Sequence, residues 1–252
     1  MIYHYCNLDA LISILKNQII WASNYKYLND STEIQSAIDV IEKNIDLIES
    51  GFVGVKGRIA LFRSLKRAMS GYDYYITSFS KKADVLSQWR GYAQNGRGVC
   101  IGFDEKCLEE LGFDVLDVIY GRQELINEIV ERAKQFLTDP PAKRDKIKLE
   151  VSFAKLIARY KSTAFIEENE KRLISVYPND APPGNLNFRR SGNFIAPYLE
   201  VSFKPKWENI VEEIWIGPSQ KDDDTKRSVL FMKNYLGYFR ASLRTSAATF
   251  RD

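Results

Sequence analysis

The sequence predicts a single α+β domain over residues 1–252. Patterns typical of helices and of strands both recur, but they do not alternate as they do in a doubly wound parallel sheet. The chain of 252 residues can form one large core, and its 45% hydrophobic and 27% charged residues are ordinary values for a globular protein. No internal repeat or low-complexity linker divides it, and we interpret the break at Asp139-Pro140-Pro141 as an insertion within the domain.

Hydrophobic spacing predicts the elements of the first half. Asn7 has the position of a helix N-cap, and Leu8 to Leu15 carry an apolar stripe at helical spacing. Asn29-Asp30-Ser31 is predicted to be a turn and cap before a second helix that contains Ile34 to Ile41. Further helices are expected at 58–69 and 85–92, and strands at 2–5, 19–22, 74–80, 99–103 and 115–120.

The second half continues the mixed pattern. Residues 178–192 are rich in Pro, Asn, Gly and Arg and predict a long loop. Asp222-Asp223-Asp224 is explained by capping at a helix N-terminus rather than by metal binding. Helices are expected at 123–137, 146–161 and 222–235, and strands at 172–176, 195–204 and 211–216.

The composition narrows the chemistry. The chain has one histidine, His4, which disfavours a histidine-based metal site. Its three cysteines match no zinc pattern and indicate a reducing, cytoplasmic compartment. Neither a signal peptide nor an apolar run of about 18 residues is present, so no membrane association is expected. A net charge of +3 permits contact with nucleic acid without requiring it.

The strongest candidate for chemistry is the charged segment around residue 170. In a strand, Glu168, Glu170 and Arg172 would point to one face. There an arginine can keep one carboxylate ionised while the pKa of the other is raised. The alternative is a solvated charge run on a helix end or an exposed strand, which is the commoner outcome for such spacing.

Other candidates carry weaker signals. Ser78 and Ser80 share one face of a predicted strand and could hold a carboxylate or a ribose. His4 on the opening strand and Trp89 on a short helix are, by themselves, more typical of core residues. Arg189-Arg190 would be a solvated pair in isolation but could meet phosphate beside an active site.

Short motifs follow one another from about residue 2 to 240: Tyr3-His4-Tyr5, Ile20-Trp21-Ala22-Ser23, Leu28-Asn29-Asp30-Ser31-Thr32-Glu33, Ser78-Phe79-Ser80, Gln88-Trp89-Arg90-Gly91-Tyr92, Gly98-Val99-Cys100-Ile101-Gly102-Phe103-Asp104, Glu168-Asn169-Glu170-Lys171-Arg172 and Ile214-Trp215-Ile216-Gly217. Their order resembles a widespread family of uncharacterised bacterial proteins related to abortive-infection and phage-defence factors. That family is similar in element order to ADP-ribosyltransferases.

The resemblance implies a fold and a cofactor. The expected fold is α+β, with ADP-ribosyltransferase-like split antiparallel β-sheets, flanked by helices, that hold NAD between them. Carried over by motif, His4 or Tyr5 would contact the cofactor from the opening strand, and Ser78 and Ser80 from a middle strand. Glu170 would be catalytic, with Glu168 as the first glutamate of a Glu-x-Glu pair.

Two further cofactor contacts complete the expected site. Arg172 follows the Glu-x-Glu pair, and Trp89 belongs to an aromatic group with Trp21 and Tyr92. Breakage of the nicotinamide–ribose bond resembles glycoside hydrolysis, in which carboxylates stabilise developing positive charge. The chemistry needs neither a metal nor a second histidine.

Three functions remain open from the sequence. The first is an NAD-dependent ADP-ribosyltransferase, a toxin or antiphage effector that modifies RNA, DNA or protein and has an antitoxin or regulator protein as its partner. The second is a defence nuclease, although Asn169 stands where its acidic residue before Lys171 would be expected. The third is a non-catalytic module that binds a nucleotide or a partner through its aromatic residues.

Overall fold

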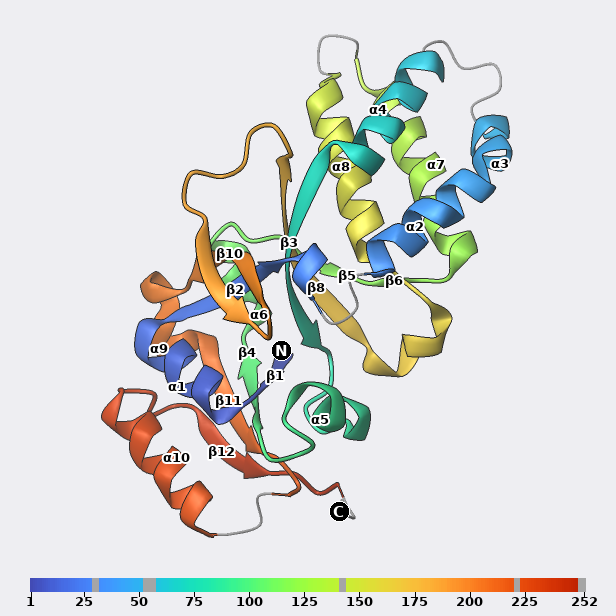
Figure 1. Cartoon of the computed structure of the whole chain (residues 1–252). Coiled ribbons are helices and arrows are strands. Elements are labelled where there is room, and N and C mark those ends of the chain that lie inside the picture. Colours follow the sequence, from blue (N-terminus) through green and yellow to red (C-terminus); the bar gives the residue numbers. More distant parts are fainter. Residues whose placement is uncertain (29–31, 52–57, 141–143, 220–222, 249–252) are drawn as a thin grey trace.

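A computed structural model describes residues 1–28, 32–51, 58–140, 144–219 and 223–248 (Figure 1). Within these residues, ten strands form one mixed sheet and two form a small parallel sheet. The strands are β1 (Ile2–Cys6), β2 (Ile19–Asn24), β3 (Tyr72–Ser80), β4 (Val99–Phe103), β5 (Val115–Asp117), β6 (Ile119–Tyr120), β7 (Tyr160–Lys161), β8 (Glu170–Pro178), β9 (Asn187–Ser191), β10 (Phe194–Ser202), β11 (Val211–Ile216) and β12 (Ser242–Thr245).

Helices surround the sheet at both ends. Figure 1 shows one group, α2, α3, α4, α7 and α8, beside one end of β3, while α1, α9 and α10 lie around the other part of the sheet. The α-helices are α1 (Leu8–Asn17), α2 (Thr32–Lys43), α3 (Ile45–Ser50), α4 (Arg58–Ser70), α5 (Leu86–Tyr92), α6 (Glu105–Glu110), α7 (Arg122–Thr138), α8 (Lys146–Arg159), α9 (Trp207–Ile210) and α10 (Asp223–Tyr235). No helix in the described ranges is long and apolar enough to cross a membrane.

The long strand β3 organises the sheet. Strand β8 pairs with it antiparallel along its whole length, from Tyr72 to Ser80. The opposite edge of β3 is shared, because β2 pairs at Tyr75 and Ile76 whereas β1 pairs at Ser80. The sheet therefore divides between β1 and β2, over residues 77–79.

In the gap between β1 and β2, side chains form hydrogen bonds with backbone groups in place of a paired strand. The ring Nδ1 of His4 lies 3.0 Å from the carbonyl oxygen of Ser78. The hydroxyl of Thr77 donates to the carbonyl oxygen of Trp21 at 3.0 Å. The backbone groups that lose a neighbouring strand thus find other partners, as buried backbone groups require.

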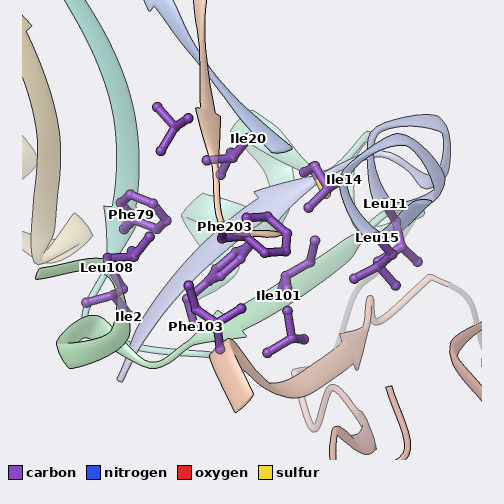
Figure 2. Close-up of a cluster of buried hydrophobic side chains, with 14 of the residues drawn as sticks. Ile2, Leu11, Ile14, Leu15, Ile20, Phe79, Ile101, Phe103, Leu108 and Phe203 are labelled. Atoms are coloured by element: carbon purple, nitrogen blue, oxygen red, sulfur yellow. The ribbon is translucent and has the colours of Figure 1, made fainter. Parts of the chain in front are cut away.

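Two hydrophobic cores lie on opposite faces of the sheet. Alternate residues of β3 supply both, as expected for a strand buried on two sides. Tyr75 and Phe79 belong to the core that contains α1. Figure 2 shows Phe79 in this core together with Leu11 and Leu15 of α1. Tyr74 and Ile76 belong to the core beneath α2, α4, α7 and α8.

The predicted α+β class is confirmed, since the structure is a large mixed sheet with flanking helices. Asn7 caps α1 by accepting the Ala10 N–H at 2.7 Å, as predicted. The predicted strands 99–103 and 211–216 agree with β4 and β11. The predicted turn and cap at 29–31 lies outside the described residues, as do Pro141 and Asp222.

Three predictions of local structure were wrong. Residues 115–120 form two short strands in different sheets, divided at Val118. The helix expected at 146–161 ends at Arg159, because Tyr160 and Lys161 pair with β6. The predicted loop 178–192 contains β9, which forms a hairpin with β10 around Gly192, a residue whose positive φ of 57° favours glycine.

Candidate functional site

A pocket of about 330 Å³ opens where β1 and β2 separate along β3. By strand register, Ser78 and Ser80 of β3 share a sheet face with Glu170 and Arg172 of β8. The residues that line the pocket are Tyr3, His4, Tyr5, Trp21, Ser23, Tyr27, Leu28, Glu33, Ile76, Thr77, Ser78, Phe79, Gln88, Tyr92, Lys161, Glu168, Glu170, Arg172, Arg189 and Ser191.

A buried ionic cluster forms one wall of the pocket. The Nζ of Lys161 lies 2.5 Å from Glu168 Oε2, 3.0 Å from Glu170 Oε2 and 3.1 Å from Glu33 Oε1. The Nε of Arg172 lies 2.8 Å from Glu170 Oε1, and its Nη2 contacts Glu33. Arg172 also donates to the carbonyl oxygen of Ala158 at 2.8 Å, which fixes the guanidinium plane.

Four separate elements deliver these charges. Glu170 and Arg172 are alternate residues of β8, while Glu33 lies in the first turn of α2, where a carboxylate is favourable to the helix dipole. Lys161 is the second residue of β7. Glu168 ends the short 3₁₀ helix η3 (Thr163–Glu168).

Local hydrogen bonds hold the two glutamates in place. Asn169, between them, adopts a left-handed conformation with φ 46°. The Glu170 N–H donates to the Tyr120 hydroxyl at 2.8 Å. The Ser80 hydroxyl donates to the Glu168 carbonyl oxygen at 2.8 Å. The backbone on both sides of Asn169 is therefore fixed by side chains from other strands.

The two glutamates have opposite pKa shifts. Burial alone would raise the pKa of Glu170, but ion pairs with Arg172 and Lys161, together with the Ser78 hydroxyl, lower it to about 2. Burial raises the pKa of Glu168 above its ordinary value, and the hydrogen bond from Lys161 only partly opposes that rise. The sequence predicted this separation for a carboxylate pair beside an arginine.

The cluster carries more negative than positive charge. Three carboxylates, those of Glu33, Glu168 and Glu170, face the two cations Lys161 and Arg172. Burial would lower the pKa of Lys161, but the surrounding carboxylates raise it, so the ammonium stays protonated. The wall therefore has a formal charge of −1 with all groups ionised, and it favours a cation or an electron-poor group in the pocket.

His4 and Tyr5 reach the pocket from opposite faces of β1. The register of Tyr3 with Ser80 places Tyr5 on the sheet face of Glu170 and places His4 on the other face. The Tyr5 hydroxyl donates to the Lys82 carbonyl oxygen and accepts from the Val85 N–H, each at 3.0 Å. Burial lowers the pKa of His4, so its ring is neutral at pH 7.

Six of the eight predicted site residues line the pocket, and two do not. His4, Tyr5, Ser78, Glu168, Glu170 and Arg172 do so. The Ser80 hydroxyl is buried against the backbone of Glu168, and Trp89 is fully buried against Tyr5, with its Nε1 donating to Asp84 at 2.7 Å. Ser80 and Trp89 thus support the pocket from behind rather than forming its surface.

The structure adds three residues that were not among the predicted site residues, although Arg189 was expected to meet phosphate if it lay beside an active site. Lys161 follows an amphipathic helix, and no motif marks it. Glu33 was present in the motif series, but spacing gave it no partner. Arg189 reaches the pocket because β9 is a strand, and its guanidinium lies 5.8 Å from the Trp21 ring centroid. The sequence Asn-Phe-Arg-Arg-Ser at 187–191 has no alternation of apolar and polar residues that would have predicted that strand.

The charged segment is not a solvated surface run. Glu168, Glu170 and Arg172 are 8%, 5% and 3% exposed, which rules out the alternative offered by spacing alone. Within the described ranges, no group of three or more His, Cys, Asp and Glu side chains is arranged to hold a metal ion. At the carboxylate cluster, the ammonium of Lys161 lies within 3.1 Å of all three acids.

Comparison with known proteins gives one match. Residues 88–173, about a third of the chain, match the profile of a family described as a protein of unknown function (DUF2971). The matched segment contains Lys161, Glu168, Glu170 and Arg172, but it ends before Arg189 and begins after His4 and Glu33. No curated protein and no solved structure matches the chain significantly.

Proposed function

We propose that the protein is an NAD-dependent ADP-ribosyltransferase, acting as a toxin or antiphage defence effector. The observation that carries the proposal is a buried carboxylate pair, Glu168 and Glu170, at a pocket formed where two strands diverge from a third. The pocket volume of about 330 Å³ is within the range of small-molecule sites.

The residues at the pocket suit a dinucleotide. Arg189 has a buried Nε with no hydrogen-bond partner in the described residues, so a donor is available for a phosphate. Ser78 presents an exposed hydroxyl beside Glu170, where a ribose could bond to it. Tyr27 and Tyr92 line the pocket and are each more than a third exposed, and such rings can stack on a base or on nicotinamide.

In the proposed reaction, Glu170 and Glu168 would have different roles. The dinucleotide, when bound, supplies an ADP-ribosyl group whose release from nicotinamide builds positive charge on the ribose. Glu170, held ionised, contributes a fixed negative charge that stabilises this charge. Glu168, with its raised pKa, is the better proton acceptor and would take the proton of the acceptor group as the new bond forms.

The test measures nicotinamide release and label transfer from radiolabelled NAD in the presence of RNA, DNA or protein. Glu170→Gln should abolish both. Because this change also disturbs a buried ion pair, Ser78→Ala serves as a second variant. Ser78 is exposed and contributes a single hydrogen bond to Glu170, so its loss should reduce turnover while lowering the unfolding midpoint far less than Glu170→Gln does. Full activity in folded Glu170→Gln protein would refute the assignment.

A non-catalytic nucleotide-binding module is the second candidate, and one observation favours it. Both oxygens of Glu170 are already engaged by Arg172 and Lys161, as in a purely structural ion network. Binding of NAD in a calorimeter without nicotinamide release would support this function. A nuclease would instead show magnesium-dependent cleavage of RNA or plasmid by the purified protein.

A further inference from the structure

A second hollow adjoins the pocket across a single indole ring. It has a volume of about 510 Å³ and lies between the end of α1 and the paired strands β2 and β10. Trp21 lines both this hollow and the pocket of the carboxylates. We call the second hollow the Trp21 groove, and its charged residues are Lys16, Glu200 and Lys204.

The Trp21 ring, which separates the two hollows, is exposed and is held in place by its neighbours, so a base can stack on it. Trp21 is 40% exposed, although the neighbouring residues of β2, Ile20 and Ala22, are buried. Its ring packs against Tyr198 at 4.5 Å between centroids. The Arg189 guanidinium lies 5.8 Å from the same ring. An indole held in position by a ring and a guanidinium loses little freedom when a base stacks on it.

The charged residues around the groove are mainly cations, which favour binding of a phosphate backbone. Lys16 and Lys204 are exposed, and neither forms an ion pair with any other residue that the structure describes. They give two cations against the single carboxylate of Glu200. The adjoining pocket wall, in contrast, carries an excess of negative charge. Phosphates are therefore favoured in the groove and disfavoured beside Glu168 and Glu170.

We infer that the Trp21 groove binds single-stranded nucleic acid, with one base stacked on Trp21 and the next nucleotide entering the carboxylate pocket. Aromatic rings interleaved with unpaired cations are the recurring means of holding single strands. A peptide acceptor would not need a stacking ring between two cationic rims. The inference rests on the proposed function for the transfer step, and it names the acceptor of that step as a nucleotide of a single strand.

The experiment measures fluorescence anisotropy of labelled eight-nucleotide single strands of RNA and DNA, and of a duplex, without NAD. The wild-type protein should bind a single strand more tightly than the duplex. Trp21→Ala should weaken binding about tenfold or more, because stacking on one base contributes roughly 1–3 kcal/mol. The double variant Lys16→Ala/Lys204→Ala should reduce the slope of log affinity against log salt by about 1.4, since each phosphate contact contributes roughly 0.7.

A matched control separates the groove from general charge. Lys66→Ala/Lys226→Ala removes two exposed lysines from α4 and α10, and it should leave both affinity and salt slope unchanged. Equal weakening in both double variants, unchanged binding by Trp21→Ala, or preference for the duplex would overturn the inference. Competition by adenosine monophosphate as strong as that by the strand would assign the groove to the dinucleotide and also overturn it.

Two measurements on the wild-type protein test this inference and the proposed function separately. Calorimetry with NAD reports the carboxylate pocket, whereas anisotropy with oligonucleotides reports the groove. Strand binding that depends on Trp21, without NAD binding or turnover, would refute the proposed transferase activity and support the nucleic-acid groove. Turnover of NAD without strand binding would refute the nucleic-acid groove and support the transferase activity.

Discussion

The two edges of β3 differ in how they are paired, and the difference locates the candidate site. On one edge, β8 forms a continuous ladder over nine residue pairs. On the other, β1 and β2 divide the strand between them and leave residues 77–79 without a neighbouring strand. The continuous edge positions Glu170 and Arg172, and the interrupted edge opens the pocket that they face. One strand thus provides both rigid positioning and access.

The largest loss of stability is expected from removing a charge of the ionic cluster on β8, the strand at the continuous edge of β3. Arg172→Ala would leave the buried Glu170 and the half-buried Glu33 beside one remaining cation, Lys161. Loss of one partner from a buried ion pair costs about 3–5 kcal/mol. Urea denaturation should show this loss in the free energy of unfolding. Arg190→Ala, on an exposed side chain of β9, should change it by less than about 0.5 kcal/mol and is the control.

The next effect concerns acid stability. The pKa of Glu170 is about 2 in the folded protein, below the roughly 4.3 of an unfolded chain. Its stabilisation is therefore complete above pH ~4.3 and is lost as the pH falls toward 2, by on the order of 3 kcal/mol. Glu170→Gln should remove this loss, so that its unfolding free energy changes less across that window than that of the wild-type protein.

Glu168→Gln gives the opposite control for the pH experiment. The raised pKa of Glu168 means that the folded state takes up a proton first, which adds stability as the pH falls. That contribution develops above the ordinary glutamate pKa of about 4.3. Without it, the total loss of unfolding free energy between about pH 7 and pH 2 should be larger than in the wild-type protein. Equal total losses in the two variants would show that the opposite pKa shifts of the glutamates are wrong.

The smallest effect is expected at the interrupted edge. Thr77→Val removes the hydroxyl that donates to the Trp21 carbonyl oxygen across the gap. Loss of one buried hydrogen bond costs about 1 kcal/mol, which corresponds to a fall of roughly 2–4 °C in Tm for a chain of this size. Thermal unfolding followed by circular dichroism measures it. Thr138→Val, at an exposed helix end, should lower Tm by less, and an equal fall would contradict the bridging role of Thr77.

The sequence predicted those parts of the fold in which pattern and burial agree. The strands at 99–103 and 211–216 carry continuous or alternating apolar residues, and their bounds were correct. β9 was missed because its residues are polar on the face toward the pocket, where Arg189 and Ser191 lie. A strand that faces a polar pocket loses the hydrophobic signal that identifies strands.

Sequence spacing by itself predicted the charged cluster of the candidate site only within one segment. Period-two alternation placed Glu170 and Arg172 on one face of β8. Lys161 and Glu33 join them through the pairing of β7 with β6 and the packing of α2, which are contacts far apart in sequence. No local pattern carries such information. The ADP-ribosyltransferase fold and cofactor, which came from resemblance, stay predictions.

The ion pairs of Glu33 with Lys161 and Arg172 link the first turn of α2 to the charged wall of the pocket. A bound group that pairs with Lys161 or Arg172 weakens the ion pairs that hold Glu33, and with it the first turn of α2, in place. The backbone amides of α2 are then expected to exchange their hydrogens faster, although the helix is not itself part of the sheet. Occupancy of the pocket can therefore be read by hydrogen exchange in α2, without knowledge of the bound molecule.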